Sequence, residues 1–319
     1  MRAMTLSAVF LGWAAVALGS AQAAFPDKPI EIITPWPAGT ETDVGTRLVA
    51  AAMSKRLNVP VQVINKPGAG GVIGITEFVK ARPDGYTLAQ GNVGPMVSQI
   101  VAGNTGYSQA DVEPLGLFNT QPYLLLAKAD APYKTMKELA AHAKAGGKEP
   151  AIGNFGPATV PTLSINRMAM ADGWKFKGVV FPATNFTQIQ AGDVEMIVVA
   201  YPVVAAQIKS GQARALVALS PKRISTLPEV PTTREAGYGF DAAIWSGLFA
   251  PKGTPADVRK KLSDVLREAL QDPTIKDFEQ KSGIVHEFVD AEAARKQMED
   301  EASGLRPVMD ALGLIKKKP

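Results

Sequence analysis

The chain has 319 residues, of which 46% are hydrophobic, and its formal net charge is +4. This length and apolar content suit two ordinary domains with full cores and exclude an intrinsically disordered chain. The positive charges are scattered and cysteine is absent, which argues against a nucleic-acid partner and excludes disulfides, thiol catalysis and thiolate metal sites.

The first 23 residues have the layout of a secretory signal peptide. Arg2 precedes an apolar run over residues 6–18, and Ala21-Gln22-Ala23 forms a cleavage site with small residues at both ends. The alternative is a membrane anchor, but the run is shorter than the roughly 20 residues that span a bilayer. We therefore expect cleavage after Ala23 and a mature protein outside the cytoplasm.

From residue 25 onward the pattern alternates between short apolar runs and helical periodicity. Strands are predicted at residues 30–34, 61–64 and 87–89, with helices at 44–57 and 72–81 between them. The alternation restarts after Pro122. There the predicted strands are 123–127, a strand from 151, 179–181, 195–200 and 213–219, and the helices are 135–145 and 161–171. Such alternation predicts a mainly parallel sheet.

Residues 243–250 are predicted to be extended, and helices at 255–270 and 291–312 follow. The terminal helix needs an apolar surface, and the first group of strands is its natural partner. We predict two α/β lobes, one formed by residues 24–122 and 243–319 and the other by residues 123–242. Because the chain crosses between them twice, we expect a hinge with a cleft between the lobes.

Ligands of parallel α/β sheets bind beyond the carboxyl ends of the strands, so the loops there hold the candidate residues. In the first loop, residues 35–43, Thr40 is a good N-cap and Asp43 completes a pattern like a capping box. The loop is either an anion-binding site beside an aromatic wall or a well-capped helix with Trp36 in the core. Its candidate ligand-binding residues are Trp36, Ala38, Gly39, Thr40 and Asp43.

The second loop, NKPGAGGVIG at residues 65–74, resembles a phosphate-binding loop at first sight. A dinucleotide fingerprint needs glycine at its first, third and sixth positions, but Ile73 occupies the sixth, and no P-loop Gly-Lys-Ser/Thr is present. What remains is a flexible backbone and a helix start, which suit a carboxylate as well as a phosphate. The alternative is a tight turn whose glycines serve packing. Its candidates are Gly68, Ala69, Gly70 and Gly71.

Polar and aromatic residues follow the other predicted strands. The further candidates are Asn92 in the first lobe and Asn154, Phe155, Thr159, Phe181, Thr184 and Asn185 in the second. No Ser/His/Asp arrangement or metal-binding motif occurs, so we expect no catalytic residue, metal or cofactor. His142 and His286 lie outside any motif and are expected at the surface.

Several ordered segments resemble one known family. They are FPDKPIEIITPWPAGTETD, VQVINKPGAGGVIG followed by ARPDGYTL, LPEVPTTREAGY and WSGLFAPKGTP. With them the chain resembles the Bug family of periplasmic solute receptors, the binding proteins of tripartite tricarboxylate transporters. The resemblance implies a two-lobed, type II-like Venus flytrap fold. It also implies a periplasmic receptor that binds a carboxylate through loop N–H groups and water and delivers it to membrane transporter subunits; we expect a monomer.

The chain departs from the family pattern at two loops. Thr40 and Glu41 stand where glycines are common, and residues 181–185 replace a loop with an aromatic residue, a Lys and two Gly. An acidic Glu41 would repel a carboxylate unless its side chain points to solvent. Three aromatic candidates favour an aromatic or bulky carboxylate over citrate: Trp36, Phe155 and Phe181. The alternatives are a receptor that serves a signalling partner and an enzyme that uses the same cleft.

Overall fold

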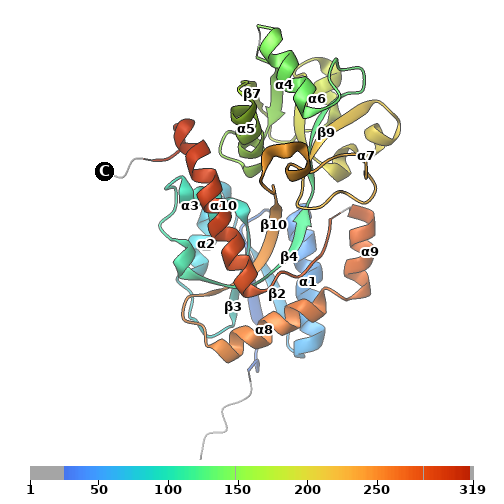
Figure 1. Cartoon of the computed structure of the whole chain (residues 1–319). Helices are drawn as coiled ribbons and strands as arrows, with labels where there is room; N and C mark the ends of the chain where they lie inside the picture. Colours follow the sequence, from blue (N-terminus) through green and yellow to red (C-terminus); the bar gives the residue numbers. More distant parts are fainter. Residues whose placement is uncertain (1–24, 148, 283, 317–319) are drawn as a thin grey trace, which may run out of the picture.

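The computed structural model describes residues 25–147, 149–282 and 284–316. The expected signal peptide lies outside these residues. The chain forms two five-stranded mixed sheets covered by helices, which are the lower and upper halves of Figure 1. The predicted two-lobed α/β fold is confirmed.

The first sheet is built from both ends of the chain. Its strand order is β2 (Val61–Asn65), β1 (Ile30–Thr34), β3 (Thr87–Asn92), β10 (Ile244–Pro251) and β4 (Val112–Gln121). Strand β1 is parallel to β2 and β3, whereas β10 is antiparallel to β3 and β4.

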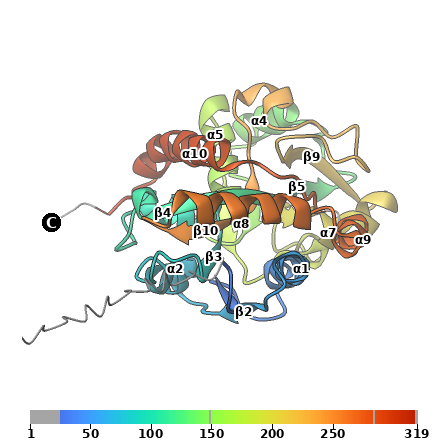
Figure 2. The same cartoon turned by 90° about the horizontal axis from the view of Figure 1, so that it is seen from below.

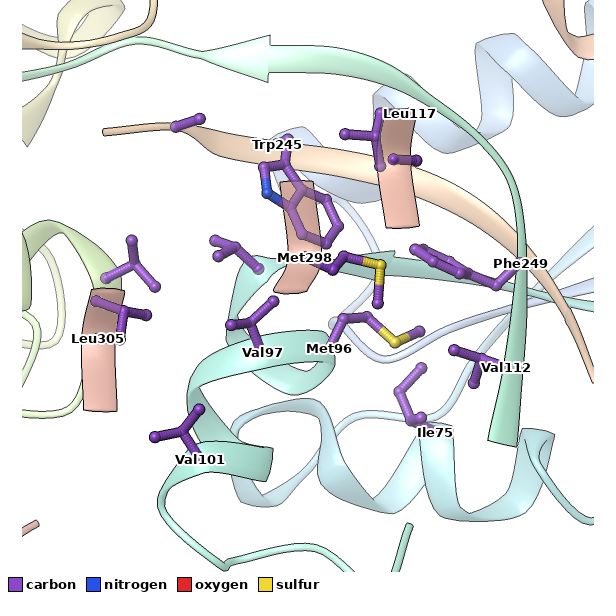
Figure 3. Packing of buried hydrophobic residues seen from close by; sticks show 14 of the residues in the cluster. Ile75, Met96, Val97, Val101, Val112, Leu117, Trp245, Phe249, Met298 and Leu305 are labelled. Carbon is purple, nitrogen blue, oxygen red and sulfur yellow. The ribbon is translucent and has the colours of Figure 1, made fainter. Parts of the chain in front are cut away.

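Helices cover both faces of the first sheet. One face packs against α1 (Glu41–Leu57) and α8 (Ala256–Ala269), and α9 (Pro273–Ser282) lies beside α1. The other packs against α2 (Val72–Phe78), the turn η2 (Gly94–Ser98), α3 (Gln99–Val101) and α10 (Ala291–Ala311). Figure 3 shows this second core, in which Trp245 and Phe249 of β10 lie among Met96, Met298 and Ile75.

The second sheet comes from one continuous segment. Its strand order is β7 (Lys177–Val180), β6 (Ala151–Asn154), β8 (Met196–Ala200), β5 (Tyr123–Lys128) and β9 (Ala213–Leu219). Helices α4 (Met136–Ala145) and α5 (Val160–Asp172) cover one face, and α6 (Phe186–Ala191) and α7 (Tyr201–Lys209) cover the other.

The chain passes between the sheets at two places. Strand β4 ends at Gln121 and β5 begins at Tyr123, so only Pro122 separates the two sheets there. The return runs from β9 through the turn η4 (Arg234–Tyr238) into β10. Apolar side chains of α5, Val160 and Leu163, also join the core beneath α10, and Figure 2 shows α10 and α9 on opposite flanks of the molecule.

Several predicted details differ from the structure. The sheets are mixed rather than mainly parallel, because the crossing strands β5 and β10 run against their neighbours. Helix α1 begins at Glu41 instead of residue 44, and Pro255 caps α8 instead of opening it. His142 is exposed as predicted, but His286 is only 5% exposed. Of the helices in the described ranges, not one has the length and apolar character to cross a membrane.

Candidate functional site

The first loop leads from β1 into α1, and Thr40 is the N-cap of that helix, as predicted. The Thr40 hydroxyl accepts a hydrogen bond from the Asp43 N–H (3.3 Å) and donates one to the Pro37 carbonyl (2.9 Å). The N–H groups of Glu41 and Thr42, at the first two helical positions, have no acceptor inside the helix. These two donors are therefore available at the carboxyl edge of the first sheet.

Asp43 fixes this loop from beneath. Its buried carboxylate accepts hydrogen bonds from the Gly39 N–H (2.9 Å), Arg47 Nε (3.0 Å) and Asn65 Nδ2 (2.8 Å). Burial alone would raise the pKa of Asp43, but these hydrogen bonds and the Arg47 charge lower the pKa below its ordinary value. These contacts give the carboxylate a role in positioning the loop, and its predicted contact with a ligand stays a prediction.

Asn65 and Arg47 belong to this arrangement, although the sequence analysis did not select them. Asn65 also donates from Nδ2 to the Trp36 carbonyl (2.9 Å), which ties the end of β2 to the first loop. Trp36 itself is half-buried, and its indole N–H is buried without a hydrogen-bond acceptor. The i,i+4 spacing of Asp43 and Arg47 is the one signal in the sequence for this network.

The glycine loop lies directly against the first loop. A side chain at Gly71, whose φ is +93°, would meet Pro95 at 3.0 Å and Pro35 at 3.3 Å. The Gly71 N–H donates to the Gly68 carbonyl (2.9 Å) in a short 3₁₀ turn, so it is not free for a ligand. The N–H groups of Ala69 and Gly70, at the start of that turn, have no partner within it.

Four residues lead from this region to the second lobe. The Glu41 carboxylate accepts a hydrogen bond from Gln121 Nε2 at the end of β4. Burial raises the pKa of Glu41, and the Gln121 hydrogen bond partly opposes the shift. Tyr123 follows, and its ring meets Phe155 edge-on at 5.9 Å. Burial, and then the charge of Glu41, raise the pKa of Tyr123 to about 12.

Most polar candidates of the second lobe are bonded within that lobe. Asn154 bridges the Ile152 carbonyl and the Gly156 N–H, and the Thr159 hydroxyl donates to the Gly156 carbonyl. Thr184 donates to the Val198 carbonyl (2.7 Å), and Asn185 caps α6. These hydrogen bonds show that the four side chains position their loops, and their predicted contacts with a ligand stay predictions.

The remaining candidates differ in exposure. Phe155 and Phe181 are half-buried, and Phe181 packs over Gly153 of β6. The Asn92 side chain accepts from the Gly94 N–H (3.2 Å). Ala38 and Gly39 are exposed at the tip of the first loop.

A separate cavity of about 730 Å³ lies next to the same crossover. Thr120 and Pro122 line it, whereas the alternate residues Gln121 and Tyr123 do not, so it opens on the other side of the strand. Its Lys222 already pairs with Glu287 (2.8 Å). The unpaired donors beside α1 therefore make a better candidate site than this cavity.

The candidate site combines backbone N–H donors, one indole N–H, a carboxylate and aromatic rings. The two histidines lie apart from it: the His142 ring packs at a tilt against Tyr133, and burial lowers the pKa of His286 to about 4. Across the described ranges, no group of three or more His, Asp or Glu side chains is arranged to hold a metal ion.

Known proteins share both the sequence and the fold. A UPF0065 protein of Cupriavidus necator is 32% identical over 311 residues, which cover 96% of this chain and 94% of that protein. Protein BugT of Bordetella pertussis is 30% identical over 284 residues, which cover 86% of each chain.

Two solved structures extend this comparison. A TctC solute binding protein from Polaromonas, solved without ligand, has a TM-score of 0.81 at 29% identity and covers 90% of this chain and 99% of its own. MatC from Rhodopseudomonas palustris, solved with bound malate, has a TM-score of 0.70 at 27% identity, with 89% and 99% covered.

A family model described as "Tripartite tricarboxylate transporter family receptor" matches residues 46–314, which include most of α1, the glycine loop and nearly all of the second half. The chain therefore belongs to this family of Bug-type periplasmic solute-binding receptors.

Proposed function

We propose that the mature protein, after removal of residues 1–23, is a periplasmic receptor that binds a small carboxylate between its two lobes. The observation that carries the proposal is the pairing of two sets of free N–H donors on one edge of the first sheet. Glu41 and Thr42 supply one set, and Ala69 and Gly70 supply the other. The two loops lie side by side, because the space where a side chain at Gly71 would go is occupied by Pro35 and Pro95.

The lobes proposed for this function are residues 24–122 with 243–319 and residues 123–242. The composition of the two sheets supports this division. Ligand that contacts both lobes favours the closed form by its differential affinity for that form. The family description supports delivery to integral membrane transporter subunits, and we propose a monomer that performs no catalysis.

The proposed ligand contacts are the backbone N–H groups of Glu41, Thr42, Ala69 and Gly70, together with Trp36 and Asn92. The loop residues Ala38, Gly39, Thr40, Gly68 and Gly71 surround these donors and shape the proposed site. Phe155 and Phe181 are the proposed contacts from the second lobe, and their rings favour an aromatic or bulky carboxylate. The buried indole N–H of Trp36 supports an acceptor-bearing ligand, because a buried donor without a partner destabilises a protein.

A thermal-shift screen of mono-, di- and aromatic carboxylates tests this function. A ligand present at a hundredfold above its Kd should raise the melting temperature by about 5 °C or more. Inorganic phosphate is the anion control. If no carboxylate raises the melting temperature, the proposed function is wrong.

A matched pair of variants tests the N–H donors directly. Glu41→Ala and Glu41→Pro both lack the carboxylate, but only the proline variant also lacks the backbone N–H. Proline suits this first helical position, since Thr40 before it has an extended backbone. The proline variant should bind every carboxylate about tenfold more weakly than the alanine variant in calorimetry. Equal affinities of the two variants would show that the Glu41 N–H does not contact the ligand.

A further inference from the structure

Glu41 carries a half-buried carboxylate. The hydrogen-bond partner of Glu41 is Gln121, an uncharged amide, and burial raises the pKa of Glu41. Among the described residues, no Lys, Arg or His side chain forms an ion pair with it. A partly buried carboxylate is destabilising unless a donor or a positive charge compensates it.

The position of Glu41 on α1 explains only part of this. An acidic residue in the first turn of a helix is stabilised by the helix dipole, and it could serve that purpose while pointing into solvent. Here the carboxylate instead points along the carboxyl edge of the first sheet to Gln121, next to Tyr123. The dipole accounts for the residue type but not for this orientation.

The neighbourhood of Glu41 suits a cation. The charge of Glu41 acts on Tyr123, whose ring meets Phe155 edge-on at 5.9 Å, and aromatic rings attract positive groups. The same residue supplies one of the free N–H donors of the anion site. A ligand bound there has its carboxylate close to the Glu41 carboxylate, and the two repel unless the ligand itself carries a positive charge.

We propose that Glu41, held by Gln121, is a specificity-determining residue that selects carboxylates which also carry a protonated nitrogen and disfavours di- and tricarboxylates. The inference rests on the proposed carboxylate-binding function and narrows its ligand class.

Isothermal titration with two matched series tests the inference. One series is butyrate, 2-aminobutyrate, 4-aminobutyrate and glutarate, and the other is benzoate, 4-(aminomethyl)benzoate and terephthalate. In at least one series, the wild-type protein should bind an ammonium-bearing member about tenfold or more tightly than its parent, and the dicarboxylate more weakly than either. Glu41→Gln should reduce the ammonium preference to about twofold or less and remove the penalty on the dicarboxylate.

The control is Glu292→Gln, which neutralises an acidic residue in the first turn of α10 and should keep the wild-type ratios. Circular dichroism and melting temperature establish that each variant is folded, and Glu41→Ser is a second neutral variant. Wild-type protein that binds the dicarboxylates best, or Glu41 variants that keep the wild-type ratios, would overturn the inference. If all members bind equally, Glu41 does not select the ligand, but the proposed carboxylate-binding function stands. If no member binds to the wild-type protein or to any variant, both the inference and the proposed function are contradicted.

Discussion

Asp43 is the residue on which the geometry of the first loop depends. Its buried carboxylate accepts from Gly39, Arg47 and Asn65, so Asp43→Ala leaves three partly buried hydrogen bonds without their acceptor. We expect this change to lower the free energy of unfolding by about 2–4 kcal/mol in urea titrations. Asp300→Ala, which removes an exposed i,i+4 ion pair with Lys296, should change the free energy of unfolding far less.

Because of the same hydrogen bonds, the contribution of Asp43 to the stability of the protein depends on pH. Its pKa is lower in the folded protein than in the unfolded chain, where an Asp titrates near about 3.9. The stabilisation is therefore complete above that value and is lost as the pH falls through the folded pKa. Asp43→Asn should lack this acidic loss, and an unchanged acid transition would contradict the role given to the carboxylate.

Trp36→Phe removes the indole N–H and keeps an aromatic ring, so it tests the contribution of the N–H. Because the N–H has no acceptor in the ligand-free structure, its removal should change the stability of the free protein by about 1 kcal/mol or less. Affinity for a carboxylate that accepts from this N–H should fall about tenfold, measured by calorimetry. Loss of stability with unchanged affinity would place Trp36 in the framework alone.

Residue types alone could not separate contact from support at this site. Thr40 and Asn185 carry recognisable capping signals, and both cap helices. Asn154 and Thr184 have the same polar character as a ligand contact, but their partners are the carbonyls of Ile152 and Val198, the second of which is distant in sequence. The Glu41–Gln121 contact likewise joins residues that no local pattern connects.

The glycine loop illustrates a constraint at the scale of an element. Gly71→Ala places a Cβ on a left-handed backbone, where it would lie 3.0 Å from Pro95 and 3.3 Å from Pro35. The change should lower the free energy of unfolding by about 2–4 kcal/mol. Gly39 also has positive φ, at +81°, but open space surrounds it, and Gly39→Ala should cost about 1 kcal/mol. Urea unfolding measures both, and equal costs would show that the packing against the prolines is unimportant.

The elements that the sequence analysis predicted are those with a clean local signal. β1 and β9 match the predicted strands residue for residue, because each is a short apolar run with polar or turn residues around it. β4 was missed because Pro114 and Gly116 interrupt its apolar pattern, and its structure depends on pairing with the distant β10. α7 was missed because it follows β8 without a turn residue.

At the scale of the whole molecule, Glu301 lies where α10 meets the second lobe. Trp245 Nε1 donates to both carboxylate oxygens of Glu301 at 2.9 Å. Glu301 also lines a small cavity together with Arg167 and Phe240. Burial raises the pKa of Glu301 to about 7. A raised folded pKa means that its contribution to stability is present at low pH and is lost as the pH rises from about 4.3 through 7.

Glu301→Gln keeps a hydrogen-bond acceptor for Trp245 and removes the titration. From pH 5 to pH 8, the free energy of unfolding of the variant should therefore rise by about 1–3 kcal/mol relative to that of wild type, measured by urea unfolding at each pH. The difference between the two proteins is the informative quantity, because the depressed pKa of His286 makes stability rise with pH in part of this range. A difference that does not change with pH would contradict the raised pKa.

The position of β10 also determines when each half of the molecule can assemble. The second sheet is complete once residues 123–219 are available, whereas the first needs β10 inserted between β3 and β4. Closure of that gap requires contacts of long sequence separation, which form slowly. In pulsed hydrogen exchange during refolding, amides of β5 and β8 should gain protection before those of β3 and β4. In a chain that emerges from its N-terminus, the first sheet therefore stays incomplete until β10 has followed, even after the second sheet has formed.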